Sequence, residues 1–338
     1  MPTERATSST KMRMRRWSQS HTIAWLVLSR SAIGVLTLLV VSILVFAATQ
    51  VLPGNAALAV LGHSVTPARV HQLEVQMHLN RPVLAQYGSW IGGLLVGHLG
   101  TSFANGQSVW HLVAPRLLNS VVLVAISGIL GSTIGMALGA FSAVKRNSVA
   151  DDSLSVTALA ITALPEFVVA VVLVILLSTV VFHLLPGVSM VSPGVYPWNV
   201  PSLLVLPVAT LVIVTVPYVF RMTRAATIEA LESDYVEMAR LKGAPTWRLL
   251  FVHALPNALA PIIQVIGLTF LYLAGGIVVV EFVFAFPGIG QGLVNAVSDR
   301  DIPVIQFIVI VLAAFYVAMN IATDVVALLV SPRRRIPR

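Results

Sequence analysis

Long apolar runs separated by polar segments dominate the chain. A helix that crosses the hydrocarbon core of a bilayer needs about 20 mainly apolar residues, because lipid offers its backbone groups no hydrogen-bond partners. Six segments meet this requirement, at residues 32–52, 117–143, 154–185, 202–220, 261–283 and 303–330. The pattern therefore predicts an all-α integral membrane protein with six transmembrane helices.

Three prolines lie in the interior of these predicted spans, Pro165 in the third and Pro207 and Pro217 in the fourth. Proline removes a backbone donor, but inside a membrane protein a neighbouring helix or a water molecule can satisfy the freed carbonyl. We expect kinks at these prolines rather than breaks in the helices.

The basic residues indicate how the spans are oriented. Of the 21 lysines and arginines, 17 lie before the first span, after the last, or in the connections between spans two and three and spans four and five. Cytoplasmic segments carry such an excess, so we predict that both termini are cytoplasmic. Orientation then accounts for the net charge of +8, and we expect no nucleic-acid partner.

Two tails and one long external loop flank the spans. Residues 1–25 are rich in Ser, Thr and Arg and are predicted to be disordered or to lie along anionic lipid headgroups, and residues 332–338 form a second basic tail. The first apolar run is longer than the roughly 7–15 residues of a signal sequence, so we interpret it as a retained anchor. The external loop, 53–116, should fold onto the membrane domain, with short helices at about 66–77 and 83–95.

Glycines recur every four residues in the second span, at Gly131, Gly135 and Gly139. They therefore share one face of the helix, and small residues at this spacing allow another helix to approach closely. The stripe predicts a helix–helix contact and says nothing about a substrate.

Three acidic residues lie within or beside the predicted spans. An ionisable group inside a span is costly unless it faces a cavity, a partner or the interface. Glu281 and Asp324 are close to predicted boundaries, where water would solvate them. Glu166 is deeper and is the candidate for lining a pathway, although protonation or a hydrogen bond between helices would also accommodate it.

The polar connection 221–260 carries charges of both signs, which favours a surface that meets another protein over an ordinary solvated connector. Gly243 can end a helix in a left-handed conformation, and Pro245 prevents the helix from continuing. We expect a short helix, a sharp stop and a return at this position.

This connection resembles the cytoplasmic motif of the membrane-spanning permease subunits of bacterial ATP-binding-cassette importers. That motif runs Glu-Ala-Ala, three residues, Gly, nine residues, Ile, one residue, Leu-Pro. The matching positions here are Glu237, Ala239, Gly243, Leu255 and Pro256. The chain departs from the motif at two positions, Met238 and His253, and neither removes the glycine turn or the Leu-Pro end.

A second set of segments resembles the dipeptide/oligopeptide permease family in particular. These segments are Glu281–Gly290, with its Pro-Gly-Ile-Gly end, Asp299–Pro303, Leu79–Pro82 and Gly100–Ser102. Together with the long first external loop they extend the resemblance over about residues 25–331, which correspond to the permease domain.

The resemblance implies the transmembrane-domain architecture of a type I importer, alternating access, and a peptide substrate. It also implies that the connection rests on a cytoplasmic ATPase through a coupling set of residues: Glu237, Ala239, Arg240, Lys242, Gly243, Leu255 and Pro256. The chain lacks a Gly-x-x-x-x-Gly-Lys-Ser/Thr loop, so we expect no cofactor in this chain and ATP and Mg²⁺ in partner ATPases. The other implied partners are a second, related permease and an external substrate-binding protein. The implied location of the chain is a bacterial inner membrane.

Two other functional classes remain open from the residues alone. A proton- or ion-coupled carrier would use Glu166 as a titrating relay. An intramembrane enzyme would need a catalytic or metal cluster, but the sequence has no His-Glu-x-x-His, no Gly-x-Ser-x-Gly and no repeated metal-like histidine spacing. The cargo also stays open, since relatives of the family carry dipeptides, oligopeptides, nickel complexes, glutathione-like thiols and some sugars.

Overall fold

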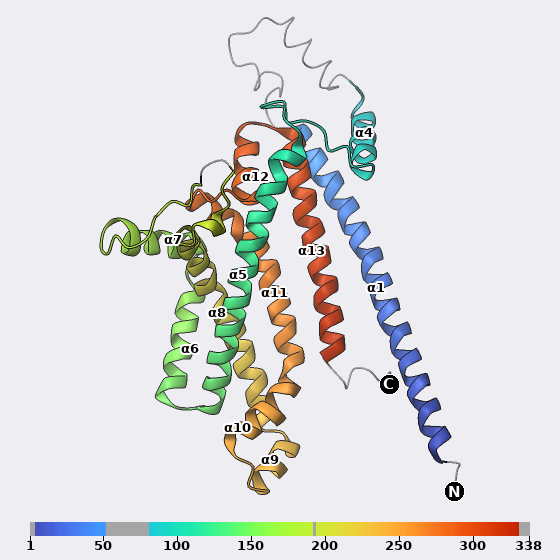
Figure 1. The fold of residues 1–338 in the computed structure, drawn as a ribbon, viewed down its shortest axis with the longest axis vertical. Helices are drawn as coiled ribbons and strands as arrows, with labels where there is room; N and C mark the ends of the chain where they lie inside the picture. Colours follow the sequence, from blue (N-terminus) through green and yellow to red (C-terminus); the bar gives the residue numbers. More distant parts are fainter. Residues whose placement is uncertain (1–3, 52–80, 192–193, 331–338) are drawn as a thin grey trace, which may run out of the picture.

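The computed structural model describes residues 4–51, 81–191 and 194–330, and in this part of the chain the regular elements are all helical (Figure 1). The α-helices are α1 (Glu4–Val51), α4 (Val83–Leu95), α5 (Val109–Val144), α6 (Val149–Thr162), α7 (Glu166–Val174), α8 (Ser202–Leu231), α9 (Asp234–Leu241), α10 (Thr246–Arg248), α11 (Leu255–Val283), α12 (Ile289–Ser298) and α13 (Ile302–Val330). A π-helical turn follows α7 at Ile175–Thr179, another joins α10 to α11 at Leu249–Ala254, and a 3₁₀ turn at Pro197–Asn199 precedes α8. Helix α4 confirms the helix expected at 83–95, whereas the one expected at 66–77 lies outside the described residues.

Five segments are long and apolar enough to cross a membrane: Trp25–Val51 of α1, α5, α8, the continuous stretch Thr246–Val283, and α13. The pair α6 and α7 supplies a sixth if it counts as one span. The structure thus agrees with an all-α membrane protein of six spans, the third of which is in two pieces.

The third span is broken, not kinked as we predicted. Helices α6 and α7 meet at an angle of 101°, and Pro165 at the junction has extended backbone angles (φ −61°, ψ 145°). Proline cannot donate to the preceding turn, and its ring pushes the residue before it out of the helical region. Pro207 and Pro217 both lie inside the unbroken helix α8, so neither of them breaks its helix.

The helices also extend beyond the bilayer-sized segments. Helix α1 begins at Glu4, where we expected a tail that is disordered or lies along anionic lipid headgroups. The helix can extend this far because adding residues to an existing helix is far easier than nucleating one. Helix α8 continues to Leu231 and helical backbone resumes at Thr246, so the connection predicted at 221–260 is mostly helical. Only residues 232–245, with α9 among them, join the two long helices.

The glycine stripe on α5 packs closely against α8. A Cβ at Gly135 would lie 2.7 Å from Cβ of Val219, and one at Gly139 would lie 2.8 Å from Cβ of Thr223. Gly131 faces Thr215 in the same way. All three glycines point at α8, so the predicted packing face is confirmed.

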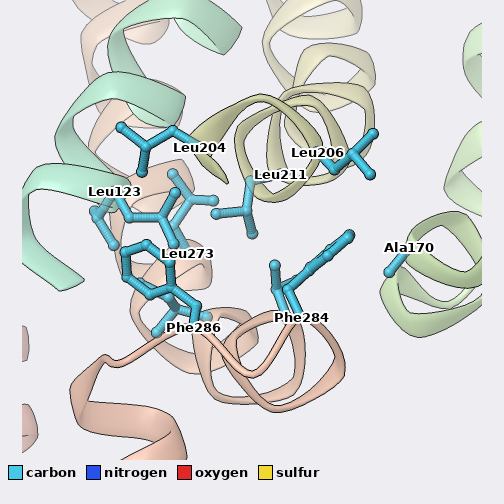
Figure 2. Close-up of a cluster of buried hydrophobic side chains, with 11 residues drawn as sticks. Leu123, Ala170, Leu204, Leu206, Leu211, Leu273, Phe284 and Phe286 are labelled. Atoms are coloured by element: carbon cyan, nitrogen blue, oxygen red, sulfur yellow. The ribbon is translucent and has the colours of Figure 1, made fainter. Parts of the chain in front are cut away.

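A second layer of contact joins α5, α8 and α11 through buried apolar side chains (Figure 2). Leu123, Leu211 and Leu273 are fully buried in this cluster, together with Phe284 and Phe286 from the turn after α11. The close packing of these buried side chains fixes α5, α8 and α11 relative to one another.

Helix α1 lies at the edge of the bundle beside α13 (Figure 1). Arg30 on α1 pairs with Asp324 on α13 at 2.8 Å, and both side chains are partly exposed. At its other end, α1 carries α4, where the hydroxyl groups of Ser42 and Tyr87 are 2.8 Å apart.

Candidate functional site

Helix α9 and the glycine turn after it form a compact projection at one end of the bundle, the end opposite α4 and α12 (Figure 1). Gly243 has φ +78°, and its N–H donates to the carbonyl of Arg240 at 2.9 Å. The N–H of Ala244 donates to the carbonyl of Ala239 at 3.2 Å. A residue with a side chain is strained at this φ, so glycine ends α9 and Pro245 starts the return, as the sequence predicts.

One side of α9 is fixed to the stretch that leads into α11. Val236 is fully buried, and the hydroxyl of Tyr235 donates to the carbonyl of His253 at 3.1 Å. Leu249 and Leu250 are buried nearby. The projection is therefore rigidly joined to the beginning of α11.

The other side of the projection is exposed and apolar. Met238, Leu241, Trp247 and Phe251 are all exposed, Leu241 to 76%. We call these four residues the coupling patch. Predicted coupling residues with charged side chains, Glu237, Arg240 and Lys242, are exposed beside it. Exposed apolar patches rimmed by polar residues mark sites of interaction with another protein or with a membrane.

The Leu-Pro end of the motif has a different place from the rest. Leu255 packs against a buried cluster that includes Ala226 and Ala258, and Pro256 occupies the first turn of α11. Proline has no N–H to donate to the preceding turn, which accounts for the π-helical geometry before it. These two residues position the projection, whereas the charged residues and the glycine shape its surface.

A cleft of about 570 Å³ separates α9 from the turn between α5 and α6. Its lining includes Glu237 and Arg240 from the predicted coupling set, and Arg146 and Glu232, which form an exposed ion pair with each other. The structure thus brings the coupling residues next to a second turn, which the predicted coupling set does not include.

An ion pair that was not predicted from the sequence ties that second turn to α8. Asp151 on α6 is fully buried and accepts two hydrogen bonds from Arg224 on α8, at 2.6 and 2.7 Å. The Ser142 hydroxyl donates to the same carboxylate, and the Asn147 N–H donates to it at 3.0 Å. A possible signal was the acidic residue three positions after the N-cap Ser148, but nothing in the sequence pointed to Arg224 as its partner.

Glu281 is buried, so the expectation that water solvates it was wrong. The Ser120 hydroxyl donates to its Oε1 at 2.5 Å, and the N–H groups of Gly290 and Gln291 donate to its Oε2 at 2.7 and 3.3 Å. The carboxylate thus caps the first turn of α12, where the helix dipole favours a negative charge. The glycines leave room for it, since a Cβ at Gly288 would overlap with the carboxylate.

Two segments of the second resemblance meet in space at this same end. Asp301, directly before α13, accepts hydrogen bonds from the Ser102 hydroxyl and from the Phe103 N–H, the latter at 3.0 Å. The external segment 100–103 is therefore fixed to the start of the last span, although almost 200 residues separate them in the sequence.

Glu166, the predicted pathway residue, lies at the broken third span. It begins α7, and its carboxyl group contacts the hydroxyl of Tyr272 and the backbone at Gly276, both on α11. A cleft of about 720 Å³ opens between α6, α8 and α11, and Tyr218 is part of its lining. The rings of Tyr218 and Tyr272 are 5.6 Å apart, so Glu166 is connected to the cleft through the two tyrosines.

A helical bundle of this kind, with a broken span beside a cleft and a rigid projection at one end, is compatible with a membrane transport protein. Comparison with known proteins gives the family. Residues 135–336 match the model of the binding-protein-dependent transport system inner membrane component, and residues 23–124 match the model of its N-terminal region. The chain belongs to this family, and it is a permease subunit of an ATP-binding-cassette importer.

Relatives match over nearly their whole length. A protein of Sinorhizobium fredii named "Probable peptide ABC transporter permease protein y4tP" is 32% identical over 310 residues, which cover 91% of this chain and 98% of that one. The metal-staphylopine import system permease protein CntB of Staphylococcus aureus is 31% identical over 313 residues, or 91% and 97% of the two chains. Membership of this family favours the importer subunit over the two alternative functional classes, a proton- or ion-coupled carrier and an intramembrane enzyme.

Proposed function

We propose that this chain forms half of the translocation pathway of a peptide importer, and that it works by alternating access. The coupling patch on the rigid projection is the observation that carries the proposal, because a transporter driven by a separate ATPase needs an exposed surface that is mechanically joined to its spans. A peptide cargo is supported by relatives whose names describe peptide permeases. The choice between dipeptides and longer peptides stays open.

The complete transporter in this proposal has four kinds of subunit. A second, related permease supplies the other half of the pathway, and one or two ATPase subunits bind ATP and Mg²⁺ and hold the coupling patch. An external binding protein delivers the peptide. Both termini and the projection are cytoplasmic, which is supported by the basic residues at that end of the spans and by the position of the projection at the same end as the start of α1 (Figure 1).

The projection couples ATP hydrolysis to peptide transport because α9 joins the ends of α8 and α11. If the ATPase pair holds α9 in different positions with and without nucleotide, the differential contact shifts the balance between the two states of the pathway. Hydrolysis then returns the spans to the inward-facing state.

The test uses variants of the glycine turn. Gly243→Pro cannot adopt φ +78° and loses the N–H that holds the turn, whereas Gly243→Asn tolerates left-handed angles. A Cβ at this position meets no neighbour within 4 Å, so the asparagine variant is a matched control. We expect Gly243→Pro and the charge reversal Glu237→Lys to reach the membrane, but to lose labelled-peptide uptake and the ATPase subunits that copurify with the wild-type chain.

Gly243→Asn should keep both uptake and copurification within about twofold of the wild type, since it costs only a fraction of the roughly 1–2 kcal/mol of a left-handed residue. Normal uptake by both Gly243→Pro and Glu237→Lys would refute the coupling role of the projection. A wild-type chain that purifies without an ATPase would refute the proposed assembly itself.

A further inference from the structure

A carboxyl group without a cationic partner lies at the break in the third span. Glu166 Oε2 is buried beside the backbone of Gly276 and has no hydrogen-bond partner, and the carboxyl group also contacts the neutral hydroxyl of Tyr272. The ion pairs found within residues 25–51, 81–191 and 194–330 do not include Glu166. A carboxyl group at membrane depth is costly without a compensating charge, and such groups mark substrate or ion pathways.

The backbone around Glu166 also indicates a path through the membrane domain. Ala163, Leu164 and Pro165 form the break between α6 and α7, and all three are exposed on the isolated chain. Irregular backbone at membrane depth is tolerated only where it is buried in protein or lines a water-filled cavity. This side of the chain therefore faces water or a second subunit rather than lipid.

Two tyrosines connect Glu166 to the 720 Å³ cleft. Tyr218 and Tyr272 are each about 40% exposed, and their rings are tilted by 42°. Tyr218 lines the cleft, and so does Val265, which is about two helical turns from Tyr272 on α11. Tyr218 thus lies toward the end of the cleft that is farther from the projection, and Tyr272 and Glu166 lie behind it, outside the lining.

The other end of the cleft has the opposite charge. Arg221 and Arg224 belong to its lining. Arg224 is paired with Asp151, whereas Arg221 is exposed and lies one turn from Tyr218 on the same face of α8. The cleft therefore has an aromatic end at Tyr218, with Glu166 behind the tyrosine pair, and a basic end at Arg221.

We propose that Glu166 and the rings of Tyr218 and Tyr272 bind the cationic ammonium group of the cargo. A carboxylate beside aromatic faces combines an ion pair with cation–π contacts, and both strengthen away from bulk water. A short peptide carries an ammonium group at one end and a carboxylate at the other, which matches the two ends of the cleft. The inference rests on the proposed peptide function and specifies which end of the peptide this subunit recognises.

The test compares two probes in cells that express the whole transporter. One probe is a mixture of leucine-labelled tripeptides with free amino groups, and the other is the same mixture after N-acetylation, which removes the positive charge. The measured quantity is the initial uptake rate of the free tripeptides divided by that of the acetylated tripeptides. Any preference of the external binding protein contributes equally to every permease variant, so it cancels when the ratios of two variants are compared.

Glu166→Gln keeps the size of the side chain and removes its charge. We expect it to lower the uptake ratio about tenfold or more, because one hydrogen-bonded charge contact is worth about a factor of ten, and to leave the acetylated mixture unaffected. Tyr272→Phe, which keeps the ring, should lower the ratio by a smaller factor. Glu229→Gln is the matched control, since Glu229 is exposed on α8 outside the cleft lining and the coupling set, and it should keep the wild-type ratio.

A Glu166→Gln transporter with the wild-type ratio would overturn the inference and leave the proposed function intact. If immunoblotting shows that this variant does not reach the membrane, Glu166→Asp and Tyr272→Phe decide, and unchanged ratios in both would overturn it as well. Wild-type cells that take up neither mixture, at the same rate as cells lacking the transporter, would instead overturn the proposed peptide function and the inference with it.

Discussion

The buried pair of Asp151 and Arg224 allows a quantitative test of how the end of the bundle that carries the projection is held together. Asp151→Asn removes the negative charge while keeping the shape of the side chain. The variant leaves the guanidinium of Arg224 opposite a neutral amide and weakens two short, charge-assisted hydrogen bonds. The connections from Ser142 and Asn147 to this side chain also become weaker.

The expected magnitude follows from how much water reaches each partner. Removing one member of a buried ion pair costs about 3–5 kcal/mol, but Arg224 is 29% exposed, so solvent partly compensates the stranded charge and we expect about 2–3 kcal/mol for Asp151→Asn. Arg224→Met strands the fully buried carboxylate instead, and should cost about 3–5 kcal/mol. The double variant should lose less than the sum of the two, because the pair interacts directly.

The assay is unfolding of the purified chain in mixed micelles as sodium dodecyl sulfate is added, followed by tryptophan fluorescence. Glu232→Gln is the control, because the pair of Arg146 and Glu232 is exposed on both sides, to 46% and 62%, and should contribute less than about 1 kcal/mol. Equal losses for Asp151→Asn and Glu232→Gln would refute the reasoning, and so would strict additivity in the double variant.

Two further predictions concern packing and the external loop. Gly135→Leu should force α5 away from Val219, costing about 1–3 kcal/mol or more and lowering the yield of monodisperse protein in fluorescence-detected size-exclusion chromatography. Gly275→Leu, at a position with no neighbour within 4 Å, should keep the wild-type yield, and similar losses for both variants would contradict the packing argument. Asp301→Ala should free the segment that begins at Ser102, so limited proteolysis should cleave this variant there several times faster than Asp299→Ala, and equal rates would show that Asp301 does not hold the loop.

The features that sequence predicted well are those with a local physical cause. A run of about 20 apolar residues can satisfy its backbone in lipid only as a helix, which is why the spans were predictable. Gly243 and Pro245 determine the turn after α9 through backbone angles alone. Spacing placed the glycines of α5 on one face, although only the structure identifies α8 as the helix they contact.

The features that sequence did not predict depend on contacts between distant segments. Nothing near Glu281 in the sequence indicates that a hydroxyl from α5 and the N–H groups of α12 would surround it, and nothing near Asp151 indicates Arg224. Pro165 shows a second limit, since a proline can kink or break a helix depending on whether neighbours satisfy the freed groups. That outcome is decided by tertiary contacts, which a single sequence does not display.

The arrangement of these contacts links the projection mechanically to the cleft between α6, α8 and α11. Helix α9 joins the ends of α8 and α11, and these two helices carry Tyr218 and Tyr272. Asp151 and Arg224 fasten α6, the third wall of the cleft, to α8. A partner that displaces α9 therefore displaces the walls of the cleft together, because packed helices move as rigid units. The break at Pro165 is the place where this motion can be taken up, since α6 and α7 are not joined by helical hydrogen bonds there, and Glu166 lies directly beside it.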